Sequence, residues 1–293
     1  VNRKVNAQSI RFFEDTGNFD AHGNVEIFIG DSLEVRCETV HYTDSSKILE
    51  MSRDLRIIFL RDSSVIYGQW GYFNIRDSTG TIGGNPIYRL PNKKREEPLT
   101  IYAQILSFSQ PDNWAKFIGE VKLTRGDLFS VSDTLFYQPD SQRIFLSGAP
   151  LVWYKRDRMS GKTISLHYEG ENLTWANVEN EAVVLSPSVE DSLKIHRLAG
   201  SHLRFLVIDD STRLIESWGD AEGQYFIWDG SGVYQGVNIC RADTITITIV
   251  NGEARSIVIA GKAIGEFYPP GFEPPGVVEK PSTVPDVVRR REE

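Results

Sequence analysis

The sequence is poor in the residues on which disulfide-stabilised proteins rely. Its 293 residues include only two cysteines, Cys37 and Cys240. They fall in the second and the last copy of a repeat described below, and strands stacked about 4.8 Å apart would separate them by roughly 29 Å. A disulfide needs Cα atoms within about 7 Å of each other. We therefore expect no intramolecular disulfide and predict that both cysteines are buried as small apolar residues.

Long apolar runs, amphipathic helical patterns and basic stripes are also missing. No run of about eighteen apolar residues occurs, so no membrane-spanning helix is predicted. Acidic residues outnumber basic ones, 40 against 32, and the two signs are interspersed, which argues against a nucleic-acid groove. The first residues, Val1-Asn2-Arg3-Lys4, form no apolar signal core. We expect either a cytosolic protein or one whose signal peptide is absent from this sequence.

Catalytic and metal-binding motifs are scarce. Ser160-Gly161-Lys162-Thr163 resembles the end of a phosphate-binding loop, but the first glycine of that motif would stand at Arg156. The chain has no Gly-x-Ser-x-Gly elbow, and its histidines show no paired ligand spacing. We expect no enzyme activity, no cofactor and no metal. A glycosidase-like carboxylate pair formed between distant strands stays open.

The six tryptophans leave two interpretations open. They could form a platform on which carbohydrate stacks, or they could fill interiors, since aromatic residues favour strands. They do not recur at one position of the repeat, which favours packing. These residues are Trp70, Trp114, Trp153, Trp175, Trp218 and Trp228.

The sequence does have a repeated pattern of short strands, which is clearest near its end. Ile245, Ile247 and Ile249 alternate with threonines, the two-residue period of a half-buried strand. Asn251-Gly252 then gives a reversal signal, and a second alternating segment leads into Gly261. The unit consists of an Asp/Thr half and a Gly-x-apolar half.

Both halves recur along the chain. Counting between copies gives about eight units of roughly 30 to 40 residues, a spacing typical of repeat architectures. One copy cannot bury its own apolar face, so neighbouring copies must stack. The Gly-x-apolar half begins at Gly23, Gly84, Gly119, Gly148 and Gly219, with a degenerate copy at Arg53, and the Asp/Thr half begins at Gln8, Glu38, Ser132, Lys162 and Ser201.

The pattern Ala21-x-Gly23-Asn24-Val25-x-Ile27, with its Asp-Thr-Ile partner at residues 243–245, resembles the OstA/LptA-like family of lipopolysaccharide transport. The resemblance implies an all-β fold, an elongated β-jellyroll or β-taco of two facing antiparallel sheets. We expect this domain to cover residues 1–268 in about eight two-strand repeats, with about sixteen strands in all. A solvated loop is expected at 90–98. The proline-rich residues 269–293 are expected to form a disordered tail.

The resemblance also implies a function. Family members carry lipopolysaccharide acyl chains between the sheets, across the periplasm to the outer membrane. By this reasoning the chain is a periplasmic lipid-binding protein whose functional residues face inward. The inward positions predicted to form the groove are Ile10, Phe12, Val25, Ile27, Val40, Tyr42, Phe73, Ile75, Val121, Leu123, Leu135, Tyr137, Ile245 and Ile247.

The two ends of such a stack would be unpaired edges, built from residues 5–13 and 244–268. We expect them to add strands of other jellyroll transport proteins, or of a second copy head to tail. The opposite hypothesis is that the tail folds back over the last edge. Two other classes stay open: a structural or adhesive β-solenoid with a packed interior and no ligand, and a carbohydrate-active β-helix. The place in the transport pathway is not fixed by the sequence.

Overall fold

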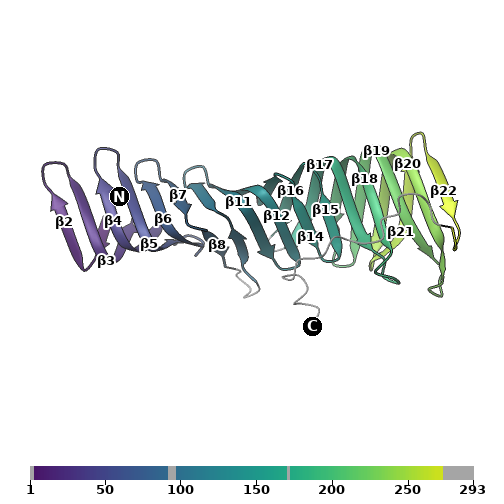
Figure 1. Cartoon of the computed structure of the whole chain (residues 1–293), viewed down its shortest axis with the longest axis horizontal. Coiled ribbons are helices and arrows are strands. Elements are labelled where there is room, and N and C mark those ends of the chain that lie inside the picture. The colour runs from purple at the N-terminus through teal and green to yellow at the C-terminus, as the bar shows by residue number, and fades with distance from the viewer. Residues whose placement is uncertain (1–2, 92–96, 170–171, 273–293) are drawn as a thin grey trace. The chain divides into compact units, whose positions relative to one another are not determined.

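The computed structural model describes residues 3–91, 97–169 and 172–272. Within these ranges every regular element is a strand (Figure 1). No helix among them could span a membrane. The strands divide into two compact units: unit 1 runs to Gly126 and includes Ser130–Ile144, and unit 2 takes Asp127–Phe129 and the chain from Phe145. The centre of the loop expected at 90–98 and most of the expected tail lie outside the described residues.

The strands of unit 1 follow one another closely along the chain. They are β1 (Arg3–Asn6), β2 (Ser9–Phe13), β3 (Asn18–Ile29), β4 (Leu33–Thr43), β5 (Ile48–Phe59), β6 (Val65–Asn74), β7 (Thr79–Gly83), β8 (Ile87–Leu90), β9 (Leu99–Tyr102), β10 (Ile105–Ser109), β11 (Trp114–Arg125) and most of β12 (Leu128–Gln138).

Unit 2 continues in the same way. After β13 (Arg143–Ser147), which begins in unit 1, it contains β14 (Leu151–Tyr154), β15 (Asp157–Ser160), β16 (Thr163–Glu169), β17 (Asn172–Pro187), β18 (Ile195–Val207), β19 (Thr212–Trp228), β20 (Tyr234–Val250), β21 (Glu253–Ala260) and β22 (Ile264–Tyr268).

Each unit has two facing sheets because its long strands cross from one sheet to the other. The first half of β3 pairs antiparallel with β2 and its second half with β1. We call the sheet that contains β2 sheet I and the one that contains β1 sheet II. Phe59 on sheet II packs edge-on against Phe108 on sheet I, with ring centroids 5.4 Å apart. The expected all-β fold with two facing antiparallel sheets is confirmed.

On alternate strands the crossing is a corner made by two consecutive residues with positive φ. At the first corner φ is 79° for Gly23 and 48° for Asn24, and the register with β4 shifts between His22 and Val25. This is a β-bulge, two residues opposite one. The Gly-x-apolar half of the repeat is therefore the corner itself. The same pair recurs at Arg53-Asp54, Gly84-Asn85, Gly119-Glu120, Gly148-Ala149, Asn180-Glu181, Gly219-Asp220 and Gly261-Lys262.

The neighbouring strand supplies a hydrogen bond that holds the corner. The backbone N–H of Gln8 donates to the carbonyl of Gly23 at 2.9 Å, and Gln104 and Asp243 do the same for Gly119 and Gly261, at 3.1 and 2.8 Å. The side chains of Gln8, Gln104 and Asp243 lie over the same glycines, where an added Cβ would come within 2.4 Å of each.

The described residues form twenty-two strands, so the expectation of about sixteen was too low. The difference arises because some segments are broken into two strands at the corner. At Pro86 and Pro150 the break has a direct cause, since proline cannot donate to the ladder. The broken segments are β1/β2, β7/β8, β9/β10, β13/β14, β15/β16 and β21/β22.

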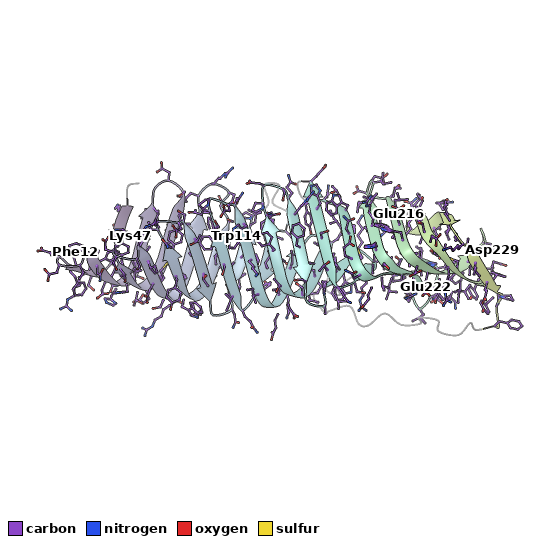
Figure 2. The ribbon with its side chains drawn as sticks, turned by 90° about the horizontal axis from the view of Figure 1, so that it is seen from above. Phe12, Lys47, Trp114, Glu216, Glu222 and Asp229 are labelled. Atoms are coloured by element: carbon purple, nitrogen blue, oxygen red, sulfur yellow. The ribbon has the colours of Figure 1, made fainter. Side chains whose placement is uncertain are left out.

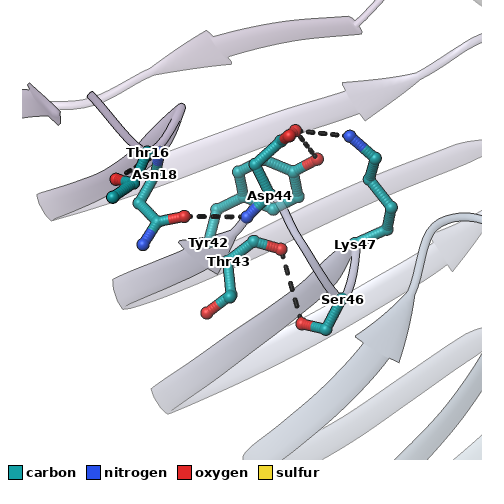
Figure 3. Close-up of polar contacts among 7 residues, drawn as sticks. All are labelled: Thr16, Asn18, Tyr42, Thr43, Asp44, Ser46 and Lys47. Carbon is teal, nitrogen blue, oxygen red and sulfur yellow. Dashed lines mark hydrogen bonds and ion pairs between the residues drawn. The ribbon is translucent and has the colours of Figure 1, made fainter. Parts of the chain in front are cut away.

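The turns at the other end of sheet I are joined by side chains (Figure 3). The Asp44 backbone N–H donates to Asn18 Oδ1 at 2.9 Å, which links the β4–β5 turn to the start of β3. The Asp44 carboxylate accepts from the Tyr42 hydroxyl at 3.0 Å and pairs with Lys47 at 2.5 Å. Asp, Asn and Ser fit these turns because their short side chains bond the nearby backbone. The turn residues therefore stack in register with the strands.

We predict that Gly84→Ala destabilises unit 1 by about 2–4 kcal/mol. The backbone φ at this corner is +80°, and an added Cβ would lie 2.5 Å from Gln69 Cβ. Both the left-handed backbone and the contact with the neighbouring strand would oppose the alanine. Urea denaturation at equilibrium measures the free energy of unfolding.

Gly126→Ala is the matched control. Its φ is +52°, but no heavy atom lies within 4 Å of the added Cβ, so only the backbone cost of about 1 kcal/mol applies. Equal losses in the two variants would contradict the role given to the corner contact.

Candidate functional site

The space between the sheets is the candidate site, because cross-strand register lines it with continuous apolar rows. Residues that face each other across a ladder share a face of the sheet. In sheet I of unit 1 the row that starts at Ala21 is buried throughout. It continues through Val40, Met51, Gly71, Ile82, Leu106 and Phe117.

Most residues predicted to line the groove are buried in the structure. Ile75 is half-buried, and Ile10 and Phe12 are exposed, at 50% and 61%. The set is divided between the two units, because Ile245 and Ile247 lie in unit 2. The buried members are Val25, Ile27, Val40, Tyr42, Phe73, Val121, Leu123, Leu135, Tyr137, Ile245 and Ile247.

The exposed pair marks the open end of unit 1. Ile10 is in register with buried Ala21, and Phe12 with Phe19, so both belong to the rows of sheet I that line the interior. They are exposed because β2 pairs only with β3 among the described strands. Figure 2 shows Phe12 at this end. The apolar interior of unit 1 is therefore uncovered at its first strand.

Unit 2 ends in the same way. Ile257 on β21 is in register with buried Ile247, yet it is 37% exposed. Within the described chain, β21 and β22 pair only with β20. Each unit thus has one end where unpaired backbone groups accompany apolar side chains of the interior.

The interior of unit 2 contains a small hollow of about 40 Å³. Its walls are largely aliphatic. Of the residues predicted to line the groove, Ile247 is the one that contacts this hollow. Arg156, Asp157 and Arg213 add a charged side to the same hollow. Its aliphatic walls are Val184, Leu198, Ile215, Ile247 and Ile249.

A buried ion pair forms this charged side. Asp157 is 2% exposed and pairs with Arg213, and the Ser186 hydroxyl donates to Asp157 Oδ1 at 2.6 Å. Burial raises the pKa of Asp157, and the Arg213 charge and the Ser186 hydrogen bond oppose that rise. Our sequence reasoning missed this cluster, because Asp157–Ser160 carries no clean alternation and Arg213 lies far along the chain.

Burial disfavours the charged form of three other polar groups of the interior. Burial raises the pKa of Tyr137 to about 12 and that of Cys37 to about 12. Burial also lowers the pKa of His196, whose Nδ1 accepts from the Phe226 backbone N–H at 3.3 Å. Both cysteines are free and buried, as expected. Among the described residues no group of three or more His, Cys, Asp and Glu could hold a metal ion.

We predict that Val121→Asp destabilises the protein by about 4 kcal/mol or more. Val121 is 1% exposed, so the carboxylate would have to be buried without a partner or force the sheets apart. Lys122→Asp on the outer face of the same strand is the control and should change stability by about 0.5 kcal/mol or less. Urea unfolding measures the free energy of unfolding of both variants. A small loss in Val121→Asp would mean that water reaches the interior.

Part of the chain is similar to known proteins. Residues 2–68 match the family model described as OstA-like protein, which confirms the resemblance found in the repeats. Among solved structures, the chain is similar to LptH from Pseudomonas aeruginosa, the LptA-homologous periplasmic component of the lipopolysaccharide transport device. That match has 10% sequence identity and a TM-score of 0.39, and covers 48% of this chain and 95% of LptH. No curated protein sequence matches significantly.

Proposed function

We propose that this OstA-like chain binds lipopolysaccharide in the periplasm and carries its acyl chains between the two sheets toward the outer membrane. The observation that supports this most is the pair of uncovered interior ends, where apolar rows continue to an unpaired strand. An inert sandwich gains nothing from exposed Ile10 and Phe12, whereas a lipid path has to be open somewhere.

The energetics are compatible with a carrier that needs no catalyst. Each methylene removed from water contributes about 0.8 kcal/mol, so one long acyl chain would offset the displacement of several interior contacts. Because the described interior is closely packed, the sheets must part before an acyl chain can enter. The competing interpretation is a packed scaffold that binds nothing. The apolar rows by themselves are compatible with both a carrier and a scaffold.

A photo-crosslinking experiment separates carrier from scaffold. We predict that p-benzoylphenylalanine in place of Tyr137 crosslinks to lipopolysaccharide, because Tyr137 lies in the interior at 6% exposure. The same probe in place of Phe136 is the control. Phe136 precedes Tyr137 on β12 and faces outward, where its ring lies 5.8 Å from that of Trp114.

Crosslinking at both positions would indicate adhesion to the outer surface. A failure at Tyr137, in a variant that still unfolds cooperatively, would contradict binding between the sheets. Competition by a fatty-acyl probe should remove the Tyr137 product, since the two would occupy the same space.

The proposal also includes docking at the ends. Unpaired strand edges accept further strands, and addition of a strand at β2 would continue the rows that end at Ile10 and Phe12. The partner is another jellyroll of the transport pathway or a second copy of this chain. A tail folded back over β21 and β22 is the alternative.

We predict that Ile10→Cys and Ile257→Cys variants, mixed and oxidised, form a disulfide between molecules. The native thiols should not compete, because Cys37 and Cys240 are buried and burial raises the pKa of each. Ser107→Cys, in the middle of sheet I, replaces Ile10→Cys in the control. Monomers throughout, with no crosslink to any other protein that carries this repeat, would contradict end-to-end docking.

A further inference from the structure

A hollow of about 250 Å³ opens on the outer face of sheet I in unit 1. It lies across β3, β4, β5 and β6, which are consecutive neighbours in the sheet (Figure 1). The interior rows lie on the opposite face of the same strands. The hollow is thus separate from the proposed lipid path.

Two short side chains make the floor of this hollow. Thr39 on β4 and Ser52 on β5 are cross-strand partners, and their hydroxyl oxygens lie 2.5 Å apart. Longer side chains stand on either side of them in the sheet, so the surface is depressed here. The floor presents hydroxyl groups that can both donate and accept hydrogen bonds.

One wall is aromatic and held in place. Trp70 and Tyr72 are alternate residues of β6, 39% and 49% exposed, with ring centroids 5.7 Å apart. Trp70 lies over Gly83, its cross-strand partner, and a Cβ there would come within 2.0 Å of the indole. Because Gly83 has no side chain, the Trp70 indole can occupy the space above it. A ligand would therefore meet an ordered ring.

Hydrogen-bond acceptors stand in the cross-strand row that runs from Asp20 to Tyr72. Asp20 Oδ1 and His41 Nδ1 are 2.6 Å apart, and Glu50 follows in the same cross-strand row. The described residues that line the hollow include two carboxylates and two histidines but no lysine or arginine, so no permanent positive charge there would attract an anion. Carboxylates suit ligands that donate from hydroxyl groups.

From this arrangement we infer that the outer hollow binds a neutral saccharide ring. The face of an aromatic ring carries negative charge density, which suits the C–H groups along one face of a pyranose. The ring's hydroxyl groups would then reach the floor hydroxyls and the carboxylates. An aromatic wall with a few convergent polar groups is the usual composition of a small-ligand site. This inference does not depend on lipid transport.

The test follows the indole N–H signal of Trp70 by NMR while methyl glycosides of glucose and galactose are added. We expect that signal to shift with a Kd of about 1 mM. Trp70→Ala removes this reporter, so binding to the variants is followed by the backbone amide signals of Thr39 and Ser52, and we expect Trp70→Ala to weaken binding at least about tenfold. Tyr67→Ala is the matched control, because Tyr67 is a 36% exposed aromatic of the same strand that does not line the hollow. It should leave binding unchanged.

A variant that fills the hollow and a cationic probe test the inference further. Ser52→Leu fills the floor from an outward position, so it should abolish binding while the free energy of unfolding is maintained. Spermine serves as the cation probe. A shift with spermine and none with the glycosides would overturn the inference, as would equal losses in Trp70→Ala and Tyr67→Ala. Interior crosslinking through Tyr137 should be unaffected by Trp70→Ala, so failure here is distinguishable from failure of the lipid proposal.

Discussion

The structure depends on the pair of left-handed residues that turns alternate strands from one sheet into the other. Such a backbone costs an L-residue about 1–2 kcal/mol, so glycine takes the first place at corners such as Gly23 and Gly119. The neighbouring strand offsets the cost with a hydrogen bond to the corner, as Gln8 does at Gly23. Without this bend, one flat sheet would leave its whole apolar face in water.

The corner also decides which residues face inward. On β3 two residues turn the corner, so buried Ala21 and Val25 keep the same parity. On β4 one residue stands opposite that pair, and the buried positions change parity between Cys37 and Val40. The apolar rows therefore stay continuous from strand to strand, although the buried positions of strands such as β4 change parity at the corner.

Much of this could be predicted from the sequence, because alternation and glycine spacing are local signals. Alternation identified the buried positions around Val121 and Leu135. The recurring glycines marked the corners, although the repeat pattern alone did not show that the strands turn there. The corner at Asn180-Glu181 lacked that signal, since two non-glycine residues adopt the positive φ there. The Asp157–Arg213 pair could not be predicted at all, because its register depends on every bulge between the two residues.

The contrast between a closely packed interior and an exposed edge within each unit is the strongest physical constraint on function. Natural sheets usually protect an edge with charges, prolines or a covering element. The edge strand β2, Ser-Ile-Arg-Phe-Phe, has one charged residue, and its inward side chains Ile10 and Phe12 are among the more exposed apolar groups of unit 1. Such an edge favours association, and a partner strand would bury the same side chains that begin the interior rows. A partner strand that covered this edge would therefore also extend the apolar rows of unit 1, and this is the physical basis of the proposed docking at β2.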